Sequence, residues 1–322
     1  MPDRLPDVET ISDRATVVGA GVMGHGIAIE FARFGSSVTV YDVDESALAA
    51  AADRIEASLT TFVASDRLSR TEADAIADRI AYESALDDAV EDATLVTEAA
   101  PEEIDTKRSV FERLDALAPA DTILVTNTSG LSITEIASAT DRPAKIAGTH
   151  WFNPPYIVPL VELIPGDDTD PTVIDRLYEL FERMGKTPVA LEEEIPGFIG
   201  NRIQLAMAYE ALSLLDQGVA SPEAIDRAVK AGFGFRLPIL GIFEKMDHSG
   251  LDVHLNVEEY LLPELDRGTE PSDALKDLVA EGRYGLKTNE GIYDWTNVDR
   301  ETVFRERDER LLDVLDTYRD VE

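Results

Sequence analysis

The segment that most restricts the fold is a glycine-rich turn between a short apolar strand and a helix. The strand is expected at 15–18, which is β-branched, and residues 27–32 repeat apolar side chains with helical spacing. The turn between them has the pattern Gly-x-Gly-x-x-Gly, which in this context predicts a dinucleotide site. The turn residues expected to bind the cofactor are Gly19, Gly21, Val22, Met23 and Gly24.

The three glycines of this turn have different expected roles. Gly19 permits the tight turn, Gly21 lets the backbone approach a pyrophosphate, and Gly24 lets the helix pack close to the strand. The N-terminus of the helix then offers amide donors and a partial positive charge to the phosphates. The alternative interpretation is an ordinary strand-to-helix turn that binds no ligand.

An acidic residue after the next predicted strand indicates which cofactor is bound. Residues 37–41 are apolar or β-branched, and Asp42 follows them, 21 residues after Gly21. A carboxylate at this distance accepts hydrogen bonds from the ribose hydroxyls of adenosine. Asp44 and Glu45 add negative charge that would repel a 2′-phosphate, so the sequence predicts NAD rather than NADP. The alternative for Asp42 is the N-cap of the following helix.

The alternation of strands and helices predicts two domains. Residues 45–80 are expected to be helical, with a capping box at 71–74. Further strands are expected at 93–97, 122–126, 145–149, 160–164 and 187–191, and only helices after 196. We therefore expect an α/β Rossmann-type dinucleotide-binding domain over residues 1–193 and a smaller all-α C-terminal domain over residues 194–322.

One imidazole and one carboxylate form a candidate acid/base pair. His150 and Glu162 lie twelve positions apart, each at the end of an apolar run expected to be a strand. Loops at the carboxyl ends of parallel strands line the ligand crevice of a doubly wound sheet. The polar residues expected at that edge are Glu102, Asn127, Ser129 and His150. Histidine suits reversible proton transfer near neutral pH, although a purely structural histidine is the alternative.

The net charge of −35 at pH 7 restricts the surroundings and the partners of the chain. Acidic residues are spread over its whole length, and only seven of the 29 basic residues are lysines. Concentrated salt screens such repulsion, so we expect a halophilic source and no nucleic-acid partner; a merely acidic protein is the alternative.

No apolar run is long enough to span a membrane and residues 1–7 do not resemble a signal peptide, so a cytoplasmic location is expected. No cysteines and four scattered histidines predict no metal site.

With these motifs, the chain resembles the L-3-hydroxyacyl-CoA dehydrogenases in their stand-alone form. The resemblance runs from Thr16 to about Trp295 and rests on residues 19–26, 98–107, 127–129, 149–155, 160–162, 197–202, 285–287 and 291–293. It implies that His150 is the acid/base, that Glu162 orients it, and that the substrate is contacted by Ser129 and Asn201. The cofactor contacts that it implies are Asp42, Glu102, Lys107, Asn153 and Lys287.

The resemblance also implies the reaction, the NAD-dependent oxidation of (S)-3-hydroxyacyl-CoA to 3-oxoacyl-CoA, as in fatty-acid β-oxidation. Ser129 and Asn201 can donate to the carbonyl oxygen on which negative charge grows during reduction. The simpler alternatives are a turn residue for Ser129, a helix cap for Asn201 and an exposed helical lysine for Lys107. Residues 198–215 predict a helix with apolar side chains on more than one face, so we expect a homodimer.

One segment departs from the family pattern. Many members have Gly-Pro-Phe or Gly-Pro-Met near the place where residues 235–244 of this chain include Arg236. Arg236 can clamp a substrate carboxylate, as in related branches that oxidise carnitine or gulonate, or it can form only a salt bridge. A dehydrogenase of a non-CoA 3-hydroxy acid is therefore the enzymatic alternative. A non-catalytic NAD-binding structural protein, such as some crystallins, is the alternative from another class.

Overall fold

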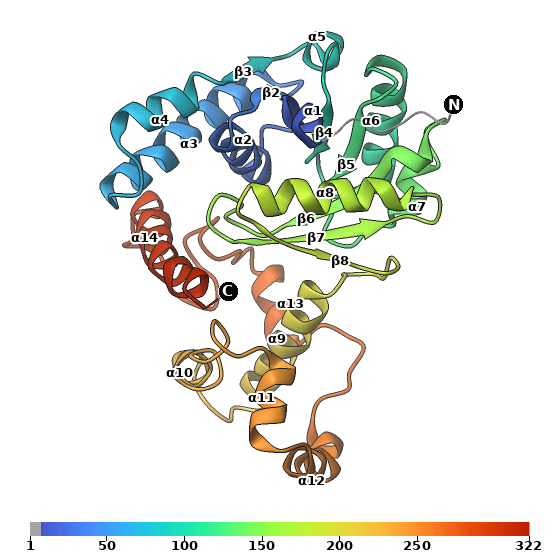
Figure 1. The fold of residues 1–322 in the computed structure, drawn as a ribbon. Coiled ribbons are helices and arrows are strands. Elements are labelled where there is room, and N and C mark those ends of the chain that lie inside the picture. The colour runs from blue at the N-terminus through green and yellow to red at the C-terminus, as the bar shows by residue number, and fades with distance from the viewer. Residues whose placement is uncertain (1–7, 322) are drawn as a thin grey trace. The chain divides into compact units, whose positions relative to one another are not determined.

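A single mixed β-sheet organises the first part of the protein, as shown by a computed structural model that describes residues 8–321 (Figure 1). The described residues form eight strands in the spatial order β3-β2-β1-β4-β5-β6-β7-β8. Their bounds are β1 (Arg14–Val18), β2 (Ser37–Tyr41), β3 (Ile80–Glu83), β4 (Leu95–Glu98), β5 (Ile123–Thr126), β6 (Ile146–Trp151), β7 (Leu160–Pro165) and β8 (Thr187–Ala190). All neighbours pair in parallel except β6 and β7, which are antiparallel.

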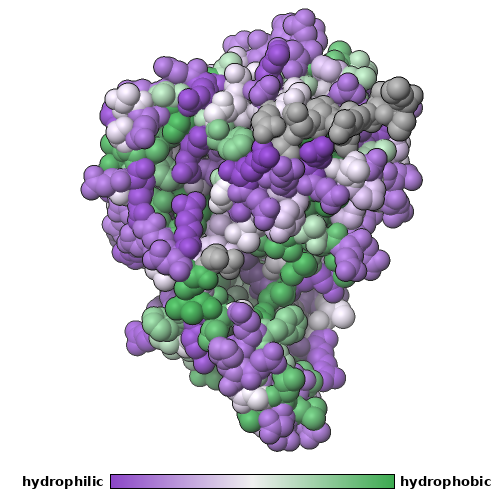
Figure 2. All heavy atoms as spheres, viewed as in Figure 1, coloured by the Kyte–Doolittle hydropathy of each residue, from purple (hydrophilic) through white to green (hydrophobic). Residues whose placement is uncertain are grey.

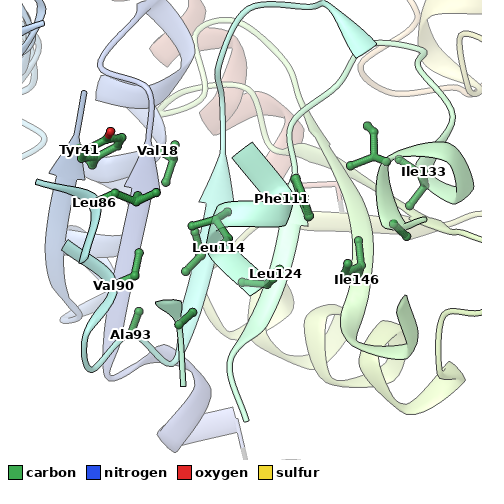
Figure 3. Close-up of a cluster of buried hydrophobic side chains, with 14 of the residues drawn as sticks. Val18, Tyr41, Leu86, Val90, Ala93, Phe111, Leu114, Leu124, Ile133 and Ile146 are labelled. Atoms are coloured by element: carbon green, nitrogen blue, oxygen red, sulfur yellow. The ribbon is translucent and has the colours of Figure 1, made fainter. Parts of the chain in front are cut away.

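Helices cover both faces of this sheet. The helices of this part of the chain are α1 (Val8–Ser12), α2 (Val22–Phe34), α3 (Glu45–Ala64), α4 (Arg70–Ala77), α5 (Leu86–Val90), α6 (Ile104–Leu117), α7 (Ile133–Ala137) and α8 (Pro171–Arg183), with a 3₁₀ turn at Pro143–Lys145. Of these, α3 and α4 pack on α2. On one face, a buried cluster joins α5, α6 and α7 to the sheet through side chains that include Val90, Phe111 and Ile146 (Figure 3). On the other, the Trp151 ring packs against Phe31 of α2 and Phe181 of α8.

Burial of these apolar side chains stabilises the sheet and fixes its carboxyl edge. Every residue of β4, β5 and β6 is buried. Phe111 is fully buried, and burying a side chain of this size contributes about 1.5–3 kcal/mol. The polar residues that follow these strands therefore begin from backbone positions that are held by the core.

In the first domain one strand was missed and the position of one capping box was predicted wrongly. Residues 80–83 form the short strand β3 at the edge of the sheet, where two of its four residues are exposed and leave no apolar pattern to recognise. The capping box begins at Ser69 and not within 71–74, because the Ser69 hydroxyl accepts from the Glu72 N–H and Glu72 accepts from the Ser69 N–H. The box therefore starts α4 at Arg70.

The chain divides into two compact units, Met1–Ile199 and Gly200–Glu322. The second unit is helical, as predicted, and consists of α9 (Gly200–Asp216), α10 (Pro222–Ala231), α11 (Ile242–Ser249), α12 (Leu251–Leu261), a 3₁₀ turn (Leu262–Glu264), α13 (Asp273–Ala280) and α14 (Arg300–Arg319). No helix of the described residues is long and apolar enough to cross a membrane. Together the two units give a Rossmann-type domain followed by an all-α domain.

Candidate active site

The antiparallel pairing of β6 with β7 brings the predicted acid/base pair together. His150 and Glu162 are direct partners in the strand register, and His150 Nδ1 lies 2.7 Å from Glu162 Oε2. The exposed fraction of His150 is 5% and that of Glu162 is 1%. When Nδ1 carries the proton that Glu162 accepts, the other ring nitrogen, Nε2, is an acceptor. Glu162 was expected at the end of a strand, but it is the third residue of β7. Because β7 runs antiparallel to β6, a residue near the start of β7 lies beside His150 near the end of β6.

Apolar rings and a second hydrogen bond hold this pair. The ring centroids of Phe152 and Phe198 lie 4.5 Å and 5.6 Å from that of His150. The other oxygen of Glu162, Oε1, accepts from the backbone N–H of Ile199 at 3.0 Å. The carboxylate is therefore fixed by two donors, and the imidazole is fixed by the carboxylate and the rings. Such an arrangement orients one tautomer of the imidazole.

The glycine turn has the close contacts that a dinucleotide site needs. Gly19 has a φ of +108°, and a Cβ at this position would lie 2.6 Å from the Ala99 carbonyl oxygen. A Cβ at Gly24 would lie 1.8 Å from the Gly19 oxygen, whereas a Cβ at Gly21 would meet nothing within 4 Å. Gly21 is the N-cap of α2 and makes no side-chain cap, so the amides of Val22 and its neighbours remain for phosphate oxygens. The residues of the turn fit the cofactor.

Asp42 lies at the carboxyl end of β2, as predicted for a ribose-binding carboxylate. Its Oδ2 accepts from the Ala20 N–H at 2.9 Å and its Oδ1 accepts from the Asp44 N–H at 3.1 Å. The first of these bonds ties the carboxylate directly to the glycine turn. The alternative role as helix cap belongs to another residue, because Asp44 is the N-cap of α3.

The loops after β4 and β5 meet through Glu102. Glu102 Oε1 accepts from the Thr128 hydroxyl and from the Ser129 N–H, both at 2.7 Å. Glu102 and Ser129 are exposed, and so is Asn153 in the loop after β6. Asn127 Oδ1 accepts from the Trp151 N–H at 3.0 Å, which joins the end of β5 to the residue after His150. Sequence reasoning placed Asn127 at this edge without assigning it this contact.

Lys107 is not the exposed helical lysine that was the alternative, because its exposed fraction is 0%. Its ammonium lies 2.8 Å and 3.0 Å from the two oxygens of Glu98, the last residue of β4. Burial raises the pKa of Glu98, while the charge of Lys107 and its hydrogen bonds act in the opposite direction. Sequence reasoning missed Glu98, and the only signal was an acidic residue at the end of a buried strand.

The remaining predicted site residues belong to the second unit. Asn201 is half-buried at the start of α9, Lys287 is exposed in the turn after α13, and Arg236 is exposed in the turn before α11. Their roles therefore remain predictions. Among residues 8–321, no group of three or more His, Asp and Glu side chains is arranged to hold a metal ion.

The fold and this edge of the sheet define an NAD-binding oxidoreductase with a buried His–Glu pair. Comparison with known families agrees: the 3-hydroxyacyl-CoA dehydrogenase NAD binding domain matches residues 14–195, and the C-terminal domain of the same family matches residues 197–295. The chain belongs to the 3-hydroxyacyl-CoA dehydrogenase family. It is an oxidoreductase whose cofactor is NAD.

Relatives of the chain differ in substrate. A probable 3-hydroxybutyryl-CoA dehydrogenase of Bacillus subtilis is 38% identical over 87% of this chain and 96% of its own length. The L-carnitine dehydrogenase of Streptomyces griseus is 34% identical over 94% of this chain and 89% of its own length. A crystal structure of 5-formyl-3-hydroxy-2-methylpyridine 4-carboxylic acid 5-dehydrogenase, described as an NAD⁺-dependent dismutase, is similar with a TM-score of 0.89 and 30% identity, covering 96% of this chain and 99% of that one.

Proposed function

We propose that the protein catalyses the reversible, NAD-dependent oxidation of (S)-3-hydroxyacyl-CoA to 3-oxoacyl-CoA, with His150 as the acid/base. The observation that carries the proposal is the buried 2.7 Å contact between His150 Nδ1 and Glu162 Oε2, on a sheet that binds NAD. A histidine oriented in this way can exchange one proton with a hydroxyl group. The family to which the chain belongs supports a 3-hydroxyacyl thioester as the substrate.

The residues of the chain supply the proton transfer. Bound NAD supplies the acceptor for the hydride that leaves the carbon of the alcohol. His150 takes the hydroxyl proton on Nε2, and Glu162 stabilises the imidazolium because it already accepts from Nδ1. The rings of Phe152 and Phe198 exclude water from this pair, which strengthens its electrostatic interaction. In the reverse direction His150 returns the same proton to the oxygen.

Two further residues are proposed to act on the reacting oxygen. Ser129 and Asn201 donate hydrogen bonds to it as negative charge develops during reduction, which lowers the barrier. Ser129 has the fixed backbone that this role requires, since its N–H is bound by Glu102. The proposed cofactor contacts are the glycine turn, Asp42, Glu102, Lys107, Asn153 and Lys287.

Acetoacetyl-CoA is the substrate that tests the proposal in the direction of reduction. We expect it to drive consumption of NADH, and of NADPH far more slowly, in a buffer of molar salt. Wild-type protein that binds NADH but reduces no ketone, CoA-linked or free, would be a non-catalytic relative, and the proposal would be wrong. A parallel reaction without protein gives the background rate.

A second candidate is the oxidation of a free hydroxy acid such as carnitine. Arg236 favours it, because an exposed guanidinium can bind a carboxylate through two parallel hydrogen bonds. The carnitine and pyridine-carboxylate dehydrogenases named above are relatives whose substrates carry carboxylates. In an Arg236→Gln variant, KM should rise for a free hydroxy acid and stay unchanged for an acyl-CoA. The substrate with the higher kcat/KM in wild-type protein decides between the two candidates.

We also propose the setting in which the enzyme works: a homodimer in the cytoplasm of a halophile. The net charge of −35 supports a saline interior, since salt at about 1 M reduces the screening length to about 3 Å. Apolar residues exposed on the helical unit support the dimer. Activity that falls when KCl is raised from dilute buffer to molar concentration would contradict the halophilic part.

A further inference from the structure

A fully buried ion pair lies directly behind the proposed site. Glu98 ends β4 and Lys107 lies on α6, and the exposed fraction of both side chains is 0%. The carboxylate is bound from all sides: Thr126 Oγ1 donates to Glu98 Oε2 at 2.6 Å, the Ala100 N–H donates to Oε1 at 2.6 Å, and Lys107 contacts both oxygens. The ammonium is therefore held by a carboxylate that accepts hydrogen bonds on both of its oxygens.

The same ammonium also faces the site. Lys107 Nζ lies 3.6 Å from Glu102 Oε2, on a side chain that is 43% exposed. The other oxygen of Glu102 holds Thr128 and the Ser129 N–H, so a continuous series of contacts runs from the core to Ser129. The Thr128 hydroxyl in turn accepts from the Leu131 N–H at 3.0 Å. The conformation of the Ser129 loop depends on where Glu102 points.

A stabilising role alone is a poor explanation for this pair. Desolvating two charges offsets most of their attraction, and apolar replacements of similar volume are often neutral or stabilising. The pair also occupies the edge where the loop after β4 meets the glycine turn, since Gly19 packs against Ala99. A charge at this place can orient a neighbouring polar group, here the Glu102 carboxylate, which an apolar residue could not do.

We propose that Glu98 and Lys107 are positioning residues: Glu98 fixes the Lys107 ammonium, which fixes Glu102 and, through it, the backbone of Ser129. In addition to the cofactor contact proposed above, Lys107 thus serves the cofactor edge through Glu102. The consequence for catalysis rests on the proposed function, because it assumes that Ser129 binds the reacting oxygen and that Glu102 contacts the cofactor. The effect on the loop itself does not depend on the substrate.

Removal of both charges together separates positioning from stability. In Glu98→Gln the buried ammonium keeps only Glu102, at 3.6 Å, as a carboxylate partner, and in Lys107→Met the buried carboxylate loses its cation, so each should lower Tm strongly. In the double variant no charge is left: the new amide oxygen can accept from the Ala100 N–H, and the new NH2 group can donate to the Thr126 hydroxyl oxygen. We expect the double variant to regain most of its Tm but to keep a loss of about 10- to 100-fold in kcat/KM, with a higher KM for NADH.

The matched control is another ion pair on the same helix. Asp115 lies near the end of α6 and pairs with Arg142 at 2.5 Å, and the two side chains are 16% and 15% exposed. Asp115→Asn/Arg142→Met should lower Tm and leave KM for NADH and kcat unchanged. A double variant at Glu98 and Lys107 that regained kcat and KM together with Tm would overturn the proposal.

Hydrogen exchange gives a result that needs no substrate. The Ser129 amide should exchange faster in the Glu98→Gln/Lys107→Met variant than in wild-type protein or in the Asp115/Arg142 control. Equal exchange would overturn the proposal, whereas faster exchange in a protein that reduces no ketone would leave the positioning intact and remove only the proposed function. If the double variant does not fold, Thr126→Val is measured instead, because it removes one donor to Glu98 at nearly constant volume. It should show the same changes, smaller in size.

Discussion

The two units of the molecule differ in how they use apolar side chains. In the first, three neighbouring strands of the sheet are buried at every residue. In the second, Ser213 is the one buried residue of α9, a helix of 17 residues. Among the described residues, all buried hydrophobic side chains lie between Ile11 and Phe198 except Leu312 and Leu315. The sheet unit contains its own core, and the helical unit does not bury its apolar residues in the same way.

This difference separates the chemistry from the association of the chain. The His150–Glu162 pair lies in the unit whose strands are held by burial, so its geometry does not require a second copy. Apolar residues gather at the surface of the helical unit, as the lower part of Figure 2 shows. Examples are Leu205, Phe235 and Phe243, which are 67%, 75% and 81% exposed. Large exposed apolar patches mark interaction sites, so we predict that this unit forms the dimer.

The largest expected effect is loss of the acid/base. His150→Ala should lower kcat by about 10²- to 10⁴-fold, because the proton of the alcohol then has no oriented acceptor. NADH affinity should change little, since the glycine turn and Asp42 lie on other strands. Initial rates of acetoacetyl-CoA reduction and a fluorescence titration with NADH measure the two effects. Full activity in this variant would show that another residue is the acid/base, and that the sheet unit does not hold the catalytic pair proposed for it.

The second prediction concerns core stability. Phe111→Ala removes a fully buried ring of the sheet unit and should lower the free energy of unfolding by about 3–5 kcal/mol. Leu205→Ala, on an exposed position of α9, should change it by less than about 0.5 kcal/mol. Denaturant unfolding at low protein concentration in molar salt measures both. Equal losses would show that the helical unit is packed as tightly as the sheet.

Much of the sheet unit could be predicted because its signals are local. The strand at 37–41 was predicted at the bounds that the structure gives to β2, and the glycine turn lies between β1 and α2 as expected. His150 and Glu162 were expected to form a pair, and the antiparallel register of β6 and β7 brings them together. These predictions needed only apolar runs, glycines and a carboxylate at a known distance.

The contacts that were missed are those that depend on distant segments. Strand β3 owes its structure to pairing with β2 and not to its own composition. Glu98 and Lys107, which form a buried pair, lie nine residues apart in the sequence. One alternative for Lys107 was an exposed side chain, because lysines on helices are usually exposed. Burial of that ammonium follows from the packing of α6 on the sheet, which no local pattern reports.

The third prediction tests the predicted association. Replacing Phe243 and Phe235 by Ser should shift the protein from dimer to monomer in sedimentation velocity at micromolar concentration. The unfolding free energy of the monomer should change little, because both rings are exposed. Replacing the exposed Val43 of the sheet unit by Ser is the matched control and should leave the mass unchanged. Wild-type protein that is monomeric in molar salt would show that the helical unit keeps its apolar surface for another purpose.

The smallest expected effect is acid sensitivity of the helix caps, which the two units share. The backbone N–H of Thr172 and then its hydroxyl lower the pKa of Asp170 at the start of α8. At the start of α14 the hydroxyl of Thr302 and then its backbone N–H lower the pKa of Asp299. Because these pKa values are lower in the folded state, the stability from the caps is present above about pH 4 and lost as pH falls further. Glu98 acts in the opposite sense. Burial raises the pKa of its carboxyl in the folded protein, so its contribution to stability falls as pH rises through that pKa.

Asn caps a helix as well as Asp does but does not titrate in this range. Asp170→Asn should therefore keep the Tm at pH 7 and reduce the fall in Tm between pH 5 and pH 3, and Asp299→Asn should do the same for the helical unit. Both changes should be small, since the two carboxylates are exposed and salt screens them. If only Asp299→Asn altered the acid response, the helical unit would unfold first, and the contrast between the two units would extend to their order of unfolding. Circular dichroism melts at the two pH values distinguish these outcomes, because a sheet unit that unfolds separately gives a second transition.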